Sequence, residues 1–121
     1  MTSSILILGI NPSSGKPNKT SATIQRLNRW MDFLHVKHYS FTNVIHNVGK
    51  YTPDIVDFEA LRVFTSDADK IIALGPFVSK SLNRAHINHF TLPHPSPLNR
   101  QLNDKTFEHE CLMKCKAFIG E

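Results

Sequence analysis

Short apolar runs alternate with segments of helical periodicity along this 121-residue chain, and this alternation is what most restricts its fold. Continuous apolar runs at residues 4–9 and 70–75, each ending in glycine, predict buried strands. Two more strands are predicted at residues 39–45 and 89–92. A helical segment follows each strand, which is typical of a mostly parallel sheet covered on both faces. We therefore expect one α/β domain over residues 1–121: a three-layer α/β/α fold with a mostly parallel four-stranded sheet.

Each helical segment has a recognisable start. Thr20 or Ser21 can cap the first helix, and residues 52–54 (Thr-Pro-Asp) combine a cap, a proline and an acid at the start of the second. Pro76 opens the third helix, and Asp104 caps the last. The positions expected in the core are Ile24, Leu27, Met31, Leu34, Phe58, Leu61, Phe64, Val78, Leu82, Phe107, Cys111, Cys115 and Phe118, together with Trp30 and the phenylalanines at helical or strand spacing.

The two cysteines, Cys111 and Cys115, lie four residues apart in the last helical segment. We expect reduced thiols packed in or near the core, because neighbouring helical turns give poor disulfide geometry and a zinc site would need two more ligands at suitable spacing.

No apolar run approaches the roughly 20 residues of a membrane span, and the N-terminus lacks the basic start of a signal peptide. We expect a cytoplasmic protein (nuclear in a eukaryote), not secreted, without metal, cofactor or membrane contact, and monomeric by default.

The net charge of +4 is unevenly distributed. Before residue 54 the only carboxylate is that of Asp32. A basic half of this kind favours a polyanionic partner such as nucleic acid, although a merely solvated basic face is an alternative. The basic residues of this half are Lys16, Lys19, Arg26, Arg29, Lys37 and Lys50.

Polar residues with catalytic potential follow three of the predicted strands. Residues 9–13 read Gly-Ile-Asn-Pro-Ser, residues 94–100 read His-Pro-Ser-Pro-Leu-Asn-Arg, and Asn43 is near the end of the second strand. Open sheets bind ligands outside the carboxyl ends of parallel strands, which meet at one edge. We therefore expect Asn11, Asn43 and His94 to share one site.

The segment from Gly9 to Lys16 also resembles a phosphate-binding P-loop. However, five residues rather than four separate Gly9 from Gly15, and Pro17 stands where a hydroxyl must reach magnesium. Hydrolysis of nucleoside triphosphates is therefore not expected.

The three side chains suit cleavage of the bond between a nucleobase and its sugar. The departing base carries negative charge, and His94, held between Pro93 and Pro95, can donate a hydrogen bond to it as a neutral imidazole. Asn11 can hold the water or contact the sugar but, being an amide, cannot act as a general base. The Asn43 oxygen can accept from uracil N3–H while its amide donates to O4, an orientation that mismatches cytosine.

A base inside a duplex must be extruded before it can be cleaved. Leu98 is an apolar residue in a polar loop and could fill the vacated space as a wedge. Ser96 and Arg100 flank it with groups suited to phosphate, and Lys16 is assigned to the same DNA contact.

These motifs resemble those of the uracil-DNA glycosylase superfamily and occur in the same order along the chain, over roughly residues 4–107. Gly-Ile-Asn-Pro is similar to motif 1 of the mismatch-specific uracil/thymine branch, and Phe-Thr-Asn-Val at 41–44 resembles that branch's base-reading strand. His-Pro-Ser-Pro-Leu is similar to motif 2 of the classical branch, with its intercalating leucine. The resemblance implies a metal-independent glycosylase with Asn11 and His94 catalytic, with Gly9, Ile10, Ser13 and Asn43 at the base, and with Leu98 as the wedge.

The chain departs from the family pattern near motif 1. Relatives stack the flipped base on an aromatic residue placed after this motif, but none occurs between Pro12 and Arg29. Ser13 stands where the classical branch has a tyrosine that blocks the C5 methyl group, so we expect weak exclusion of thymine. The cysteines that hold an iron–sulfur cluster in some relatives are absent.

Each site residue also has a structural interpretation: Asn11 can shape a turn, His94 can bond to backbone, Asn43 can cap a strand end, and Leu98 can be core. The leading functional hypothesis is a DNA glycosylase that removes uracil or a related pyrimidine by base flipping. One alternative is an enzyme that acts on free nucleotides, nucleosides or modified bases. Another is a non-catalytic nucleic-acid- or protein-binding module on a degenerate glycosylase fold.

Overall fold

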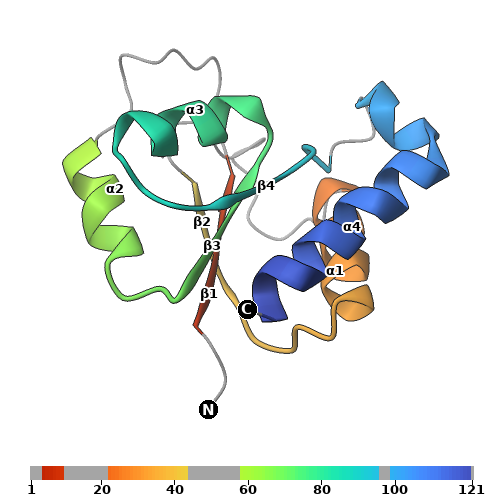
Figure 1. The fold of residues 1–121 in the computed structure, drawn as a ribbon, viewed down its shortest axis with the longest axis horizontal. Coiled ribbons are helices and arrows are strands. Elements are labelled where there is room, and N and C mark those ends of the chain that lie inside the picture. Colours follow the sequence, from red (N-terminus) through yellow and green to blue (C-terminus); the bar gives the residue numbers. More distant parts are fainter. Residues whose placement is uncertain (1–3, 10–21, 44–57, 96–98, 121) are drawn as a thin grey trace.

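Strands and helices alternate along the chain in the order that the sequence predicts. The computed structural model describes residues 4–9, 22–43, 58–95 and 99–120. The elements, in chain order, are β1 (Ile5–Gly9), α1 (Ala22–Phe33), β2 (Ser40–Asn43), α2 (Phe58–Thr65), β3 (Lys70–Leu74), α3 (Pro76–Arg84), β4 (Phe90–Leu92), the 3-10 helix η2 (Arg100–Asn103) and α4 (Lys105–Gly120) (Figure 1).

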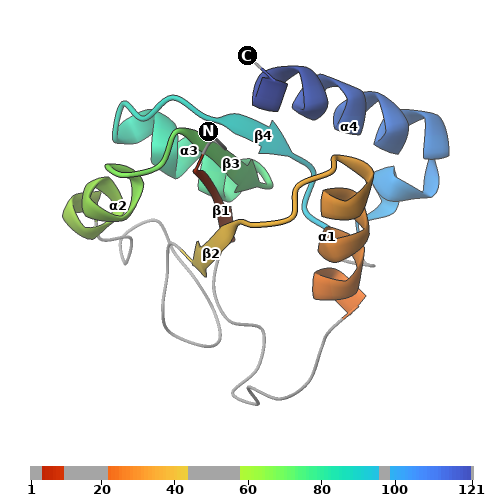
Figure 2. The same cartoon turned by 90° about the horizontal axis from the view of Figure 1, so that it is seen from below.

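The four strands form one sheet in the order β2-β1-β3-β4, and every neighbouring pair is parallel. Helices α1 and α4 cover one face of the sheet, and α2 and α3 cover the other (Figures 1 and 2). The predicted three-layer α/β/α architecture with a parallel four-stranded sheet is therefore confirmed. All five residues of the central strand β1 are buried, as expected for a strand that has helices on both sides.

The alternation of side chains along β1 divides the core into two clusters. Ile5 and Ile7 pack in the cluster that includes Leu27 and Trp30 of α1 and residues of α4. Leu6 and Leu8 pack in the cluster formed with α2 and α3. Full burial of one such side chain stabilises the fold by about 1.5–3 kcal/mol, so the two clusters hold the helical layers against the sheet.

The predicted starts of the last two helices are confirmed. Pro76 is the first residue of α3, where its missing N–H costs nothing. The Asp104 carboxylate accepts hydrogen bonds from the backbone N–H groups of Thr106 and Phe107, at 3.0 and 3.2 Å. The predicted starts at Thr20 or Ser21 and at 52–54 lie outside the described residues.

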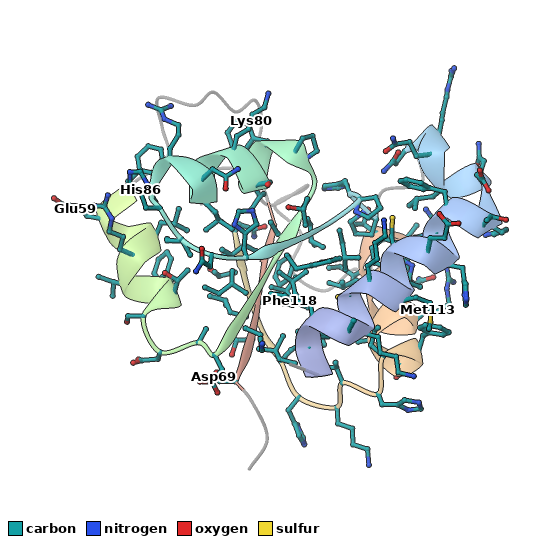
Figure 3. The ribbon with its side chains drawn as sticks, in the orientation of Figure 1. Glu59, Asp69, Lys80, His86, Met113 and Phe118 are labelled. Carbon is teal, nitrogen blue, oxygen red and sulfur yellow. The ribbon has the colours of Figure 1, made fainter. Side chains whose placement is uncertain are left out.

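The last helix packs as predicted. Cys115 is fully buried, and Phe107, Cys111 and Phe118 lie against the same core cluster. Both thiols are free, and burial raises the pKa of Cys115 to about 12. Figure 3 shows Phe118 on the side of α4 that faces the sheet, whereas Met113 points away from it.

The expectation that the phenylalanines belong to the core is wrong at three positions: Phe33 and Phe41 are 40% exposed, and Phe64 is 39% exposed. Leu61 and Thr65 take the buried face of α2 and leave Phe64 at its border. Phe33 ends α1 and meets His109 of α4 edge-on at the surface, with ring centroids 5.8 Å apart. Phe41 lies on β2, which is an edge strand and has a neighbour on only one side.

The 3-10 helix η2 was not predicted. Asn99 caps it by accepting a hydrogen bond from the backbone N–H of Gln101, and its residue Leu102 has a buried side chain.

Among the described residues, no helix has the length and apolar character needed to cross a bilayer.

Candidate functional site

The register of the sheet aligns the ends of its strands at one edge. Gly9 pairs with Asn43, and Leu74 pairs with Leu92. The register between β1 and β3 places Gly9 beside Leu74. These four residues form a row across the sheet that is about 14 Å wide, because neighbouring strands lie about 4.8 Å apart. His94 follows two residues after Leu92 and so lies just beyond this carboxyl edge.

At the end of β1, two side chains of β2 lie over Gly9. A Cβ atom added to Gly9 would lie 2.8 Å from Asn43 Oδ1 and 3.0 Å from Cζ of Phe41. That Cβ would point to the same side as Ile7, so Asn43 and Phe41 meet on the side covered by α1 and α4. Glycine is therefore required at position 9 for the close approach of a carboxamide and an aromatic ring.

At the end of β3, His94 lies against Gly75. Gly75 has a φ of +89°, and a Cβ added there would lie 3.3 Å from Cβ of His94. The Gly75 N–H donates to the Leu92 carbonyl at 2.8 Å and so extends the ladder between β3 and β4 by one step. Gly75 has no side chain and has a positive φ, and both features let residues 93–95, called here the His94 segment, lie directly over the end of β3.

Two further residues hold the His94 segment in place. Pro95 is fully buried. The Asn99 carboxamide donates to the His94 carbonyl at 2.9 Å, while its oxygen caps η2. Asn99 thus joins the backbone of His94 to the start of η2. Sequence reasoning missed this role of Asn99, because asparagine is a preferred helix cap but no pattern in the sequence predicts the short helix η2 that it caps.

The imidazole of His94 is half-buried, and burial lowers its pKa below the ordinary value of 6.5. The side chain is therefore neutral at neutral pH. A neutral imidazole carries one proton on its ring nitrogens, so it donates one hydrogen bond and accepts another.

The structure brings three of the predicted site residues, Gly9, Asn43 and His94, to the same edge of the sheet. Gly9 is buried beneath Asn43 and Phe41, and Arg100 is exposed at the first position of η2. Figure 1 shows that the chain leaves β4 toward the side of the sheet occupied by α1 and α4, the side on which Asn43 and Phe41 lie. The other predicted site residues, which lie outside the described residues, are Ile10, Asn11, Ser13, Lys16, Ser96 and Leu98.

The described part of this edge offers neutral hydrogen-bonding groups and one aromatic ring. The Asn43 carboxamide can donate and accept, and the neutral His94 can donate. Within residues 4–9, 22–43, 58–95 and 99–120, no group of three His, Cys, Asp or Glu side chains is placed to hold a metal ion. The arrangement suits recognition of a flat polar molecule and stabilisation of a developing negative charge.

Comparisons with protein-family models, with curated proteins and with solved structures found no match to this chain.

Proposed function

We propose that this chain is a DNA glycosylase that hydrolyses the N-glycosidic bond of uracil, or of a related pyrimidine, after flipping the base out of the helix. The observation that carries the proposal is the placement of the Asn43 carboxamide and a neutral His94 imidazole at one edge of one parallel sheet. The order and spacing of the three motifs support it from the sequence.

In the proposed reaction, the ring N–H of His94 donates a hydrogen bond to a carbonyl oxygen of the departing base. Negative charge develops on this oxygen as the glycosidic bond breaks, and a fixed donor stabilises that charge by the equivalent of 10²- to 10³-fold in rate, roughly. The buried Pro95 and the hydrogen bond from Asn99 limit the movement of the His94 segment, so little reorganisation is needed during the reaction.

Asn43 reads the base in this proposal. Its oxygen accepts from N3–H of uracil and its amide donates to O4, whereas cytosine presents the opposite pattern at position 4. The oxygen of the carboxamide lies over Gly9, which is the last residue of β1. Asn11 remains assigned to the water or the sugar, Leu98 to the wedge, and Ser96, Arg100 and Lys16 to the DNA.

The direct test is incubation with oligonucleotides that differ at one base, followed by alkaline cleavage at abasic sites. We expect cleavage at uracil, a loss of about 10²- to 10³-fold with His94→Ala, and no loss with His38→Ala, which alters an exposed histidine on the loop before β2. Asn43→Asp should shift the preference toward cytosine, and Asn83→Asp on the exposed surface of α3 should not.

Three outcomes would contradict the proposal. Full activity in the double variant Asn11→Ala/His94→Ala would refute the assigned roles. Activity on a free nucleotide or nucleoside with none on DNA would select the alternative substrate. Salt-sensitive DNA binding without an abasic product from any base would identify a binding module.

A further inference from the structure

We propose that Ser79 and His89 form a nucleophile and base pair that takes a small acyl group from an activated ester onto the Ser79 hydroxyl. Ser79 lies on α3, and His89 directly precedes β4. Neither side chain has a role in the proposed reaction on DNA, so this inference is independent of the proposed function.

The hydrogen bonds of His89 determine which of its ring nitrogens can take up a proton. Nδ1 lies 2.9 Å from the Ile87 carbonyl oxygen. A carbonyl oxygen only accepts, so in the neutral ring Nδ1 carries the proton and Nε2 presents a lone pair. Nε2 lies 2.8 Å from the Ser79 hydroxyl oxygen, which therefore donates to it. A hydroxyl is activated where it lies within about 2.6–3.2 Å of a base that a third group orients, and this pair meets both conditions.

Two features favour negative charge near the Ser79 oxygen. Ser79 lies in the first turn of α3, and this turn contains no acidic side chain to neutralise the positive end of the helix dipole. The Thr91 hydroxyl donates to the Ser79 oxygen at 2.9 Å. When the Ser79 oxygen forms a bond to carbon, the Thr91 hydroxyl is close enough to donate to the neighbouring oxyanion instead.

Exposure at this site limits the size of the acyl group. The Thr91 side chain is exposed, whereas Ser79 and His89 are partly buried. A substrate therefore reaches the Ser79 oxygen from the side on which Thr91 lies. Because the Ser79 oxygen is partly covered, a short acyl group such as acetyl reaches it more readily than a branched one.

The acyl transfer proceeds in two steps. In the first, the Ser79 oxygen bonds to the ester carbonyl carbon, its proton moves to Nε2 of His89, and the π electrons of the carbonyl group move to its oxygen. In the second, the carbonyl group forms again, the bond to the leaving oxygen breaks, and this oxygen takes the proton from Nε2. The products are acyl-Ser79, the free alcohol and a neutral His89. Water then cleaves the acyl-serine by the same proton transfers, which releases the carboxylic acid and restores Ser79.

The test incubates the unmodified protein with p-nitrophenyl acetate and follows the acetylation of each serine by peptide mass spectrometry. The matched comparison within the same molecule is Ser66, an exposed residue whose hydroxyl donates to the Val63 carbonyl. We expect acetyl-Ser79 to form about 10²- to 10⁴-fold faster than acetyl-Ser66, the range for catalysis by a general base. This measurement involves no substitution, so it does not depend on the folding of a variant. Equal rates at the two serines would overturn the proposal.

A second measurement separates catalysis by His89 from a structural role. His89→Ala should slow the acetylation of Ser79 by about 10²- to 10⁴-fold. Added imidazole should restore part of the rate, because it supplies the missing base, whereas it would not repair a loss of structural support. The matched control is His38→Ala, which alters an exposed histidine and should acetylate Ser79 at the rate of the unmodified protein. An unchanged rate in His89→Ala, or a reduced rate that imidazole does not raise, would refute the role of His89 as the base and with it the proposal.

Discussion

Gly9 is the last residue of β1 and Gly75 directly follows β3, yet a methyl group would have different effects at the two positions. At Gly9 the nearest atoms are the far ends of the Asn43 and Phe41 side chains, which can move aside. At Gly75 the backbone has a φ of +89°, and the nearest atom is Cβ of His94, which is fixed to the main chain. A methyl group on Gly9 would therefore displace the side chains of Asn43 and Phe41, whereas a methyl group on Gly75 would strain the backbone.

We therefore predict a contrast between Gly9→Ala and Gly75→Ala. Gly75→Ala should lower the free energy of unfolding by about 1–3 kcal/mol, because alanine is strained at positive φ. Gly9→Ala should cost less stability but should reduce uracil excision, because it moves Asn43 and Phe41. Urea unfolding and the oligonucleotide assay measure the two effects. Equal destabilisation by both substitutions, with excision unchanged in Gly9→Ala, would contradict this account.

The half-buried imidazole of His94 predicts a dependence of stability on pH. Burial lowers its pKa in the folded protein, whereas in the unfolded chain the pKa is near 6.5. Below pH 6.5 the unfolded chain binds the proton more readily, so acid favours unfolding. The stability linked to His94 is constant above pH 6.5 and declines as the pH falls from 6.5 toward the native pKa.

This dependence can be measured by comparing the unmodified protein with His94→Gln in urea at pH 7.5, 6.5 and 5.5. The difference in the free energy of unfolding between the two proteins should change below pH 6.5 and remain constant above it. An NMR titration of the His94 ring should give a midpoint below 6.5. A midpoint at or above 6.5 would contradict the effect of burial, and a midpoint above 7 would show that the imidazole is mostly charged at neutral pH, where the proposed reaction needs it neutral.

At the scale of elements, a chain of side-chain hydrogen bonds ties the edge strand β4 to α3. The Nδ1 atom of His89 lies 2.9 Å from the Ile87 carbonyl, which can only accept, so Nδ1 carries the proton. Nε2 is then an acceptor, and the Ser79 hydroxyl, at 2.8 Å, donates to it. Thr91 in turn donates to Ser79 at 2.9 Å. All three bonds thus have a defined direction, and β4, which leads directly to His94, is held against α3.

We predict that Ser79→Ala lowers the free energy of unfolding by about 1 kcal/mol, because it removes the group that links the other two side chains. The matched control is Ser66→Ala, since the Ser66 hydroxyl bonds only to a carbonyl of its own helical turn. Urea unfolding measures the difference, and nitrogen NMR of His89 should show the tautomer with the proton on Nδ1. A proton on Nε2 would make His89 the donor to Ser79 and would contradict the assignment.

At the scale of the whole molecule, the layered architecture was predictable from local patterns. The apolar runs at residues 4–9 and 70–75 identified the two central strands because a strand buried on both faces needs apolar side chains at every position. The helix starts at Pro76 and Asp104 followed from backbone chemistry alone. The position of Asn43 and His94 at one edge followed from the parallel topology.

Other features depend on contacts between distant segments and could not be predicted. The exposure of Phe41 arises because β2 is an edge strand, and the strand order is not visible in any local pattern. The positive φ of Gly75 is required only because the His94 segment crosses above it. The bond from Asn99 to the His94 carbonyl joins residues whose separation suggests no regular element.

The hydrogen bond from Asn99 to the His94 carbonyl has an evolutionary consequence. It joins two residues on either side of positions 96–98 directly, so the place of the His94 carbonyl does not depend on those three side chains alone. In the proposed glycosylase, selection can therefore change the side chains at these positions while Asn99 keeps the His94 carbonyl in place.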